Sequence, residues 1–233
     1  PPSYGMTIPT GIFPSFSYSF NSGTQNSESV LHAETVHKER LRVQKLQQEM
    51  LLLNEQLMVQ SQHDALTGLP NRAYLNNYAE ETLSKALKNQ VNFGIEILDI
   101  DFFKSVNDTY GHMEGDHYLT AVADLLSRIT EEYSNVFAAR YGGDEFVLVY
   151  YDKSVDEIKE IMNQLKLSTV SVKLPAISQL GEDHVTLSQG CCNRIPEPLN
   201  RLWDYLARAD TVLYDVKKKG KNNYKVSERF KKA

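Results

Sequence analysis

Two apolar runs surround a Gly-Gly step in the segment Val136-Phe-Ala-Ala-Arg-Tyr-Gly-Gly-Asp-Glu-Phe-Val-Leu-Val-Tyr-Tyr151. β-Branched and aromatic residues favour strands, and a short polar step between two such runs is typical of a hairpin. The pattern therefore predicts a β-hairpin whose connection, residues 142–145, carries two glycines and two acids. Consecutive glycines let a backbone turn with positive φ or approach a ligand closely. The alternative is an ordinary polar hairpin tip, since turns use these residue types routinely.

Helical and extended patterns alternate from Asp64 to the C-terminus. Helices are expected at residues 71–87, 116–132, 155–167 and 199–218, and further strands at residues 91–101, 184–192 and close to the C-terminus. Together with the hairpin, this order contains the βαββαβ core of a split βαβ sheet. The sequence therefore predicts an α+β fold with a ferredoxin-like βαββαβ core.

The composition is that of a folded globular chain. Of its 233 residues, 41% are hydrophobic and 24% are charged, and 25 basic against 30 acidic residues give a formal charge of −5. This balance disfavours a dedicated nucleic-acid binder, so no nucleic-acid partner is expected. Two neighbouring cysteines, Cys191 and Cys192, do not make a disulfide framework, and a cytoplasmic location is expected. No apolar run is long enough to span a membrane, while the Pro-Pro start leaves room for an upstream sensor or membrane tether.

The segment before Asp64 divides into two regions. Residues 1–30 contain several prolines and almost no charge, and we expect an irregular leader or the remnant of an upstream domain. Residues 31–63 lack glycine and proline, and apolar residues spaced alternately three and four apart form the a/d seam of a coiled coil at Val43, Leu46, Met50, Leu53 and Leu57. The seam favours a parallel dimer stalk that carries a signal. The alternative is a single amphipathic helix lying on its own domain, because additional apolar residues widen the stripe.

A second polar cluster, Asp99-Ile-Asp-Phe-Phe-Lys-Ser-Val-Asn-Asp108, ends the strand expected at residues 91–101. Removing an unpaired carboxylate from water costs several kcal/mol, so acids at the mouth of a buried strand need a partner. A magnesium ion is a suitable partner, because it takes one or two carboxylates and keeps water and phosphate oxygens as its other ligands. Lys104 could then reach a phosphate in the same site. The alternative is that the two acids cap a following helix.

The two clusters are more informative together than apart. A split βαβ sheet places its central strands side by side, so Asp99 and the turn at residues 142–145 are expected to meet. Asp99 and Asp144 would then be metal ligands, with Glu145 as an adjacent acid. Such an arrangement is typical of two-metal phosphoryl or nucleotidyl transfer.

The turn Gly142-Gly-Asp-Glu-Phe146 resembles the signature for which the GGDEF family of diguanylate cyclases is named. The resemblance runs from Asp64 to about Val226. It includes the motifs Asp64-Ala-Leu-Thr-Gly-Leu-Pro-Asn-Arg72, Asp99 to Asp108, Gly111-His-Met-Glu-Gly-Asp116, Ala209-Asp210, Leu213-Tyr214 and Lys217-Lys-Lys-Gly-Lys-Asn222. It implies a nucleotidyl cyclase and polymerase-palm type of fold at residues 64–233, preceded by a coiled-coil helix. It also implies that two GTP are condensed to cyclic di-GMP and two pyrophosphates.

The resemblance implies roles for individual residues. The catalytic residues would be Asp144, Glu145 and Lys104, and the metal ligands Asp99, the Ile100 carbonyl and Asp144, holding Mg²⁺ or Mn²⁺, two ions per active site. The GTP-binding residues would be Phe102, Phe103, Asn107, His112, Asp116, Gly142, Gly143, Lys217 and Lys221. A carboxylate at Asp116 accepts from the N1–H and N2–H₂ edge of guanine and would face a lone pair on adenine, which favours GTP over ATP. The alternative for Asp116 is an acid that stabilises a helix N-terminus.

In the family, two GTP-loaded domains face each other, and each 3′-hydroxyl attacks the α-phosphate bound by the partner. The resemblance therefore implies a homodimer, and the helix at residues 31–63 would hold the two domains together. Tethering converts a bimolecular encounter into a local one.

The sequence departs from the family pattern at several positions. Tyr133 and Val136 stand where many members carry the Arg-x-x-Asp of an inhibitory product site. Lys221 replaces a usual arginine, so a point charge stands where a bidentate fork is common, and Gln189 and Val216 replace a usual apolar residue and an alanine. Because no expected metal ligand is lost, we expect an active enzyme. The alternatives are a catalytically silent module that binds GTP, and a dimerising signalling stalk for which the cyclase domain is only an anchor.

Overall fold

The computed structural model describes residues 32, 35–52, 62–172 and 184–230, which fall into two compact units, Pro1–Gln56 and Leu57–Ala233. The irregular region expected at residues 1–30 and the seam positions Leu53 and Leu57 lie outside the described residues. None of the described helices is both long and apolar enough to cross a membrane.

In the first unit, residues 35–52 form a helix, as the absence of glycine and proline there predicts. The described seam side chains are all exposed: Val43 by 49%, Leu46 by 56% and Met50 by 66%. Lys45 and Glu49 form an ion pair one helical turn apart on its surface. An apolar seam in contact with solvent is what a coiled-coil partner would cover, and this pairing stays a prediction.

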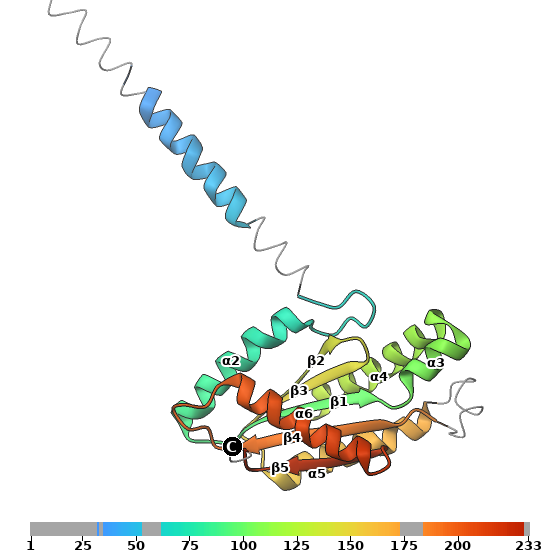
Figure 1. Ribbon diagram of the computed structural model, residues 1–233. Helices are drawn as coiled ribbons and strands as arrows, with labels where there is room; N and C mark the ends of the chain where they lie inside the picture. Colours follow the sequence, from blue (N-terminus) through green and yellow to red (C-terminus); the bar gives the residue numbers. More distant parts are fainter. Residues whose placement is uncertain (1–31, 33–34, 53–61, 173–183, 231–233) are drawn as a thin grey trace, which may run out of the picture. The chain divides into compact units, whose positions relative to one another are not determined.

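A mixed sheet of five strands, in the order β2-β3-β1-β4-β5, forms the centre of the second unit (Figure 1). The strands are β1 (Phe93–Ile100), β2 (Val136–Gly142), β3 (Glu145–Tyr151), β4 (Leu187–Arg194) and β5 (Asn223–Ser227). Only the β4–β5 pair is parallel among these strands. The expected ferredoxin-like βαββαβ core is confirmed, with β1 lying between β3 and β4 at its centre.

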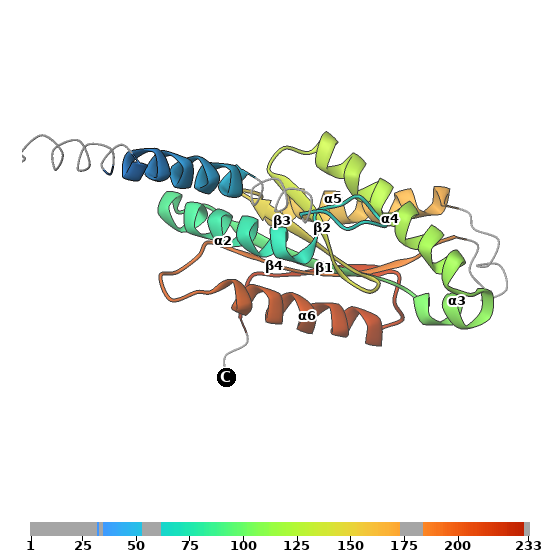
Figure 2. The same ribbon diagram turned by 90° about the horizontal axis from the view of Figure 1, so that it is seen from above.

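Helices cover both faces of the sheet. They are α2 (Arg72–Asn89), α3 (Phe103–Tyr110), α4 (His112–Glu132), α5 (Val155–Ser168) and α6 (Leu202–Lys218), with a single 3₁₀ turn at Thr169–Ser171. Figure 2 shows α6 on one side of the sheet and α4 with α5 on the other. Alternate side chains of β1 enter two separate cores: Ile95 and Ile97 pack with α2 and α6, whereas Leu98 and Ile100 pack with α4 and α5. Every residue of β1 is therefore buried.

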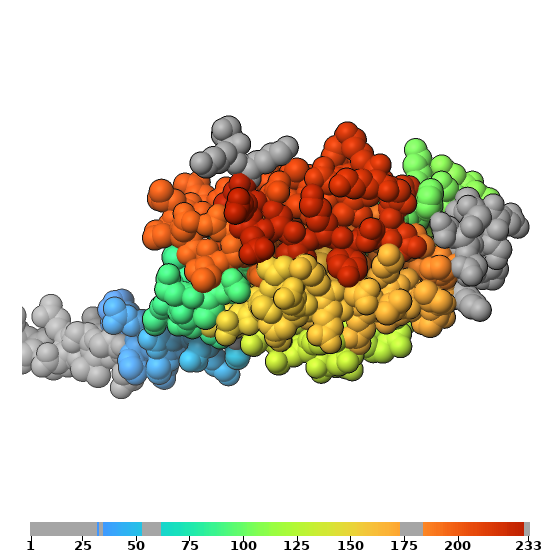
Figure 3. Space-filling model, turned by 90° about the horizontal axis from the view of Figure 1, so that it is seen from below, coloured from blue at the N-terminus to red at the C-terminus, as the bar shows by residue number. Residues whose placement is uncertain are grey.

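The C-terminal strand β5 closes one edge of the sheet and contacts both α5 and α6. Figure 3 shows this edge from below, with the C-terminal segment beside α5. The turn at residues 219–222, called the lysine-rich turn below, connects α6 to β5. The edge strand therefore also fixes where this turn lies.

The helix α3 was not expected from the sequence. It has only eight residues, of which Val106 alone is buried, so its apolar pattern is too short to be distinctive. The expected helix at residues 116–132 begins earlier, at His112, and Gly111 with φ +84° separates it from α3. This left-handed conformation suits glycine and redirects the chain between the two helices.

A carboxyl group, Glu96, is buried in the middle of β1. It is 0% exposed, and the Tyr150 hydroxyl donates a hydrogen bond of 2.5 Å to its Oε2. Its other oxygen has no hydrogen-bond partner among the described residues. Burial raises the pKa of Glu96 to about 7, against the opposing effect of the Tyr150 bond. The folded protein therefore favours the neutral carboxyl.

Glu96 should make the free energy of unfolding depend on pH. Folding raises the pKa of Glu96, so the protonated carboxyl stabilises the folded state fully below about pH 4.5. This stabilisation is lost as the pH rises to about 7, and the free energy of unfolding falls by about 3 kcal/mol in total. Glu96→Gln keeps the shape and an acceptor for Tyr150 without this titration. Urea unfolding between pH 4.5 and 7.5 should show the stability of Glu96→Gln rising relative to wild type as the pH increases. Parallel curves would contradict the prediction, and the exposed Glu131→Gln is the control.

Candidate active site

The end of β1 and the start of β3 bring the two acidic clusters together. Asp99 lies directly opposite Glu145 in the antiparallel β1–β3 pair. The amide of Ile100 donates to the backbone carbonyl of Asp144 at 3.4 Å. The sequence-based expectation that Asp99 meets the turn at residues 142–145 therefore agrees with the strand register.

Burial and mutual repulsion perturb the acids at this strand end. Asp99 is only 8% exposed, and burial, reinforced by the charge of Asp144, raises its pKa to about 6. Lys217 on α6 opposes this shift, with its Nζ 2.7 Å from Asp99 Oδ2. Burial, together with the charge of Asp144, also raises the pKa of Glu145. The site therefore concentrates negative charge that one lysine compensates only in part.

This donor set fits a hard divalent cation. The carboxylates of Asp99 and Asp144 and the carbonyl of Ile100 offer only oxygen atoms, which Mg²⁺ prefers. Within residues 32, 35–52, 62–172 and 184–230, no group of three or more His, Cys, Asp and Glu side chains could hold a metal ion. Magnesium commonly takes only one or two protein carboxylates and keeps water and phosphate oxygens as its other ligands.

The signature turn leaves open space above its glycines. Gly143 has φ +57°, a left-handed conformation that side chains with a Cβ rarely adopt. A Cβ added at Gly142 or at Gly143 would meet no other atom within 4 Å. A ligand could therefore approach the backbone beside Asp144 closely.

Cationic side chains and backbone amides flank the acids. Phe102, with φ +61°, is the N-cap of α3, so the first turn of this helix has N–H groups without partners within the helix. Lys104 is exposed in that turn. From the other side, Lys221 Nζ lies 3.6 Å from the centre of the Phe102 ring. The structure therefore brings Lys217 and Lys221 to the same strand end as Phe102 and Asp99.

Asp101 was considered in the sequence only as one of two acids that cap a following helix, but the N-cap of α3 is Phe102 and receives no side-chain hydrogen bond, and the structure gives Asp101 another role. It accepts hydrogen bonds from the hydroxyls of Thr186, at 3.0 Å, and Ser188, at 2.7 Å, and from the backbone amide of Asn222, at 3.0 Å. Asp101 is buried and anchors the lysine-rich turn between α6 and β5 to the end of β1. These donors are far away in the sequence, so no local signal could reveal them.

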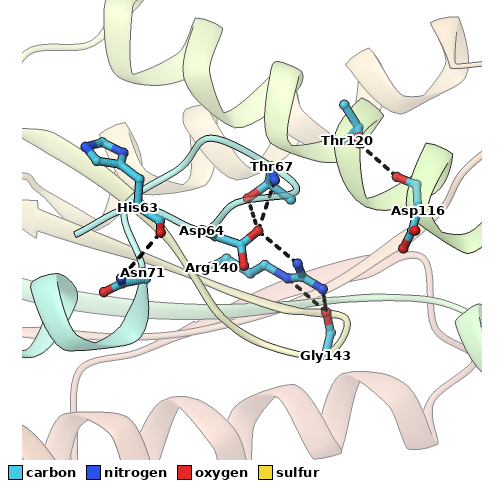
Figure 4. Close-up of polar contacts among 8 residues, drawn as sticks. All are labelled: His63, Asp64, Thr67, Asn71, Asp116, Thr120, Arg140 and Gly143. Carbon is cyan, nitrogen blue, oxygen red and sulfur yellow. Dashed lines mark hydrogen bonds and ion pairs between the residues drawn. The ribbon is translucent and has the colours of Figure 1, made fainter. Parts of the chain in front are cut away.

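The expected base-recognising residues lie on α3, which Figure 1 shows beyond the end of β1, and at the start of α4, the helix that covers one face of the sheet. Asn107 Oδ1 is buried without a hydrogen-bond partner in the described part of the chain, and a Cβ at Gly115 would lie 2.0 Å from it. His112 and Asp116 are exposed near the start of α4. The Thr120 hydroxyl donates to the Asp116 backbone carbonyl at 2.9 Å (Figure 4). This bond does not involve the Asp116 carboxylate.

Two further features of the site were missed in the sequence. Glu145 lines a hollow of about 370 Å³ with Asp210, Tyr141 and Trp203, and the charge of Asp210 contributes to the raised pKa of Glu145. Arg140, just before the glycines, donates to the Gly143 carbonyl from Nη2 at 2.8 Å and from Nε at 3.2 Å. Its place beside the signature turn was the only sequence signal for this contact.

Comparison with known proteins places these features in a family. The family model described as "Diguanylate cyclase, GGDEF domain" matches residues 61–223. Diguanylate cyclase DgcZ of Escherichia coli strain K12 is 33% identical over 167 residues, covering 71% of this chain and 53% of DgcZ. The bifunctional diguanylate cyclase/cyclic di-GMP phosphodiesterase MucR of Pseudomonas aeruginosa is 31% identical, covering 73% of this chain and 24% of MucR. The chain thus spans about half or less of the length of these relatives.

A solved structure matches over more of both chains. The crystal structure of the coiled coil and GGDEF domain of DgcB from Caulobacter crescentus, in complex with c-di-GMP, is 28% identical, with a TM-score of 0.66. The match covers 86% of this chain and 98% of that one. The likeness supports the sheet order and the helix arrangement described above.

We predict that Asp101 stabilises the fold and that Asp144 does not. Asp101→Ala leaves buried donors of Thr186, Ser188 and Asn222 without an acceptor, so the free energy of unfolding should fall by about 3 kcal/mol. Asp144→Asn removes repulsion from Asp99 and Glu145 and should leave the stability equal to wild type or slightly higher. Urea unfolding followed by circular dichroism measures both, and equal losses in the two variants would contradict the assignment.

Proposed function

The chain belongs to the GGDEF family of diguanylate cyclases, and from this we propose that it condenses two GTP into cyclic di-GMP with release of two pyrophosphates. The observation that carries the proposal is the meeting of Asp99 with Asp144 and Glu145 at the end of β1, beside Lys217 at the end of α6 and Lys221 in the turn that follows. Carboxylates and lysines at one strand end can bind a metal-complexed triphosphate.

Asp99, Asp144 and the Ile100 carbonyl would hold Mg²⁺ or Mn²⁺, two ions per active site. When bound, such ions polarise the α-phosphate and lower the pKa of the attacking hydroxyl. The excess negative charge around Asp99 supports a cation there. The ammonium of Lys217, now 2.7 Å from Asp99, would be free to turn to a phosphate once that charge is neutralised.

The triphosphate would lie between the first turn of α3 and the lysine-rich turn. The amides of Phe102 and Phe103 and the side chain of Lys104 would bind it from one side, and Lys217 and Lys221 from the other. Unpaired amides at the start of a helix favour anions. Lys221 offers a point charge where a guanidinium would offer a fork, so its contribution to orienting the phosphate is smaller.

Asn107, Asp116 and His112 would recognise the base. The buried acceptor of Asn107 lacks a partner in the described structure and could accept from a guanine amino group. The carboxylate of Asp116 would accept from the N1–H and N2–H₂ donors of guanine. Adenine has a lone pair at N1 in place of this donor. These contacts support GTP as the substrate.

In the reaction, the 3′-hydroxyl of one GTP attacks the α-phosphorus of the other and expels pyrophosphate. The hydroxyl proton passes to Asp144 or Glu145. The raised pKa of Glu145 makes it a better proton acceptor than an ordinary carboxylate. Two such steps close the ring, so atoms and charges balance with no further reactant.

Each chain would carry half of this reaction centre, so we assign the domain at residues 64–233 to a homodimer joined by the helix at residues 31–63. The exposed seam on residues 35–52 supports the pairing. We place the domain in the cytoplasm, where GTP is available, with or without an upstream membrane tether. At the position of the usual product site, Val136 is buried and the Tyr133 hydroxyl donates to Gln164, so weak inhibition by product through this position is expected.

Turnover of GTP tests the function. Wild type with GTP and Mg²⁺ should yield cyclic di-GMP, resolved by chromatography, and Asp144→Asn should lower the rate at least about 100-fold because the site loses a metal ligand and a charge. GTP binding without product at high protein concentration would overturn the cyclase proposal and favour a silent GTP-binding module. Omitting Mg²⁺ and Mn²⁺ should abolish the product as well.

Disrupting the seam tests the dimer. Leu46→Glu places a charge at a d position, so light scattering should give the mass of a monomer. Turnover per chain should then fall at low protein concentration and recover as the concentration increases, because association becomes bimolecular. Gln48→Glu, at an outward f position of the same helix, is the matched control. Wild-type mass and turnover in Leu46→Glu would contradict the role of the helix.

A further inference from the structure

The only tryptophan of the chain is exposed on α6, the helix that Figure 2 shows on one side of the sheet. Trp203 is 69% exposed. Tryptophan side chains are highly buried on average, so an exposed indole is informative. Within the part of the chain that the structure describes, no aromatic ring packs on Trp203 and no cation lies over it. Its ring is therefore available to a ligand.

Trp203 lines the hollow of about 370 Å³ beside Glu145, which is called the Trp203 hollow below. A hollow of this size lies within the range of small-molecule sites. Much of its lining is apolar: β1 supplies Ile97, and α6 supplies Leu206 and Ala207. Ile97 and Leu206 belong to the core between the sheet and α6, so this part of the lining is held by packing. The hollow can therefore receive the apolar body of a small molecule.

The charged side chains that line the Trp203 hollow are both acidic. Glu145 comes from the start of β3 and Asp210 from α6. The carboxylate of Asp210 forms no ion pair and no hydrogen bond among the described residues. The positive charges of Arg72 and Lys217 act on Glu145 from outside, because neither side chain lines the hollow. Negative charge in a concave, partly apolar surface favours a ligand that carries positive charge.

Aromatic rings in the lining favour the same kind of ligand. Tyr141 lines the hollow, and the guanidinium carbon of Arg72 lies 4.3 Å from the centre of its ring. One aromatic ring of the lining thus already binds a cation of the protein itself. Indole attracts cations more strongly than the other aromatic side chains do. An ammonium group in the hollow would therefore lie against Trp203, within reach of the acids.

We propose that the Trp203 hollow binds a small organic ammonium ion, whose apolar body fills the hollow and whose charge lies between Trp203, Asp210 and Glu145. Of the residues that line the hollow, Glu145 alone belongs to the proposed reaction centre. An ammonium ion paired with Glu145 would prevent it from accepting the hydroxyl proton, so the bound amine would slow the reaction. This slowing rests on the proposed function, whereas the binding itself does not.

Binding is tested by the fluorescence of Trp203, which reports on this hollow because the chain has no other tryptophan. The probe is phenethylamine, which has an apolar ring and is an ammonium ion at about pH 7.5. It should quench the emission with half-saturation at about 1 mM or below. Phenethyl alcohol has the same body without the charge, so it should bind at least about tenfold more weakly.

Two variants change the hollow at exposed positions of α6. Asp210→Asn removes one carboxylate and should weaken the binding of phenethylamine at least about fivefold. Ala207→Leu introduces a good helix former that fills the hollow, so it should abolish the quenching. Asp124→Asn, at an exposed position of α4, is the matched control and should bind like wild type. Urea unfolding checks that each variant is folded.

Turnover of GTP by the full chain tests the consequence of binding. Phenethylamine should inhibit the wild type, and half-maximal inhibition should occur at the concentration that gives half-maximal quenching. Ala207→Leu should keep its own uninhibited rate at the same concentrations of the amine.

Unchanged emission of the wild type at about 10 mM phenethylamine would overturn the proposal. Equal affinity for phenethyl alcohol, or full affinity in Asp210→Asn, would overturn it as well. Emission that depends on protein concentration and not on the amine would indicate a side chain of a second copy in the hollow, which would also contradict a small-molecule site. If the wild type binds the amine but makes no product, the proposed function fails and the binding site stands.

Discussion

The pairing of β1 with β3 in a single register is the constraint on which the site depends. Every residue of β1 is buried, and its side chains alternate between two cores. A shift by one residue would exchange the two faces, so Ile95 and Ile97 would leave the core under α2 and α6. It would also separate Asp99 from Glu145. The apolar packing that stabilises the sheet therefore also fixes the positions of the carboxylates to which we assign the reaction.

The acids within β1 and directly after it differ in how the protein compensates their burial. Asp101 receives three hydrogen bonds, so its charge is satisfied and its role is to hold the lysine-rich turn. Burial and the charge of Asp144 raise the pKa of Asp99 to about 6, and the ion pair with Lys217 opposes this shift only in part. Glu96, with one bond from Tyr150, is favoured in its neutral form. The incompletely compensated charge at Asp99 is where a cation lowers the free energy most.

Strong local patterns made the sheet, the hairpin and the meeting of the acidic clusters predictable. The apolar runs of β1 and β3 are long, and the ferredoxin-like order leaves few ways to pair them. The helix α3 could not be predicted in this way, because eight residues with one buried side chain carry little periodic signal. The role of Asp101 and the pairing of Arg140 with Asp64 were missed because the partners lie 121 and 76 residues away. Such contacts follow from the fold and not from any local pattern.

The proposed reaction centre, shared between two chains, would need acids that are held rigidly. The sheet register supplies the rigidity, because moving Asp99 relative to Glu145 would require unpairing buried strands. The Gly143 carbonyl belongs to an exposed turn, so its position can change without disturbing either core. Arg140 connects this turn to Asp64, because its guanidinium donates both to the Gly143 carbonyl and to the Asp64 carboxylate.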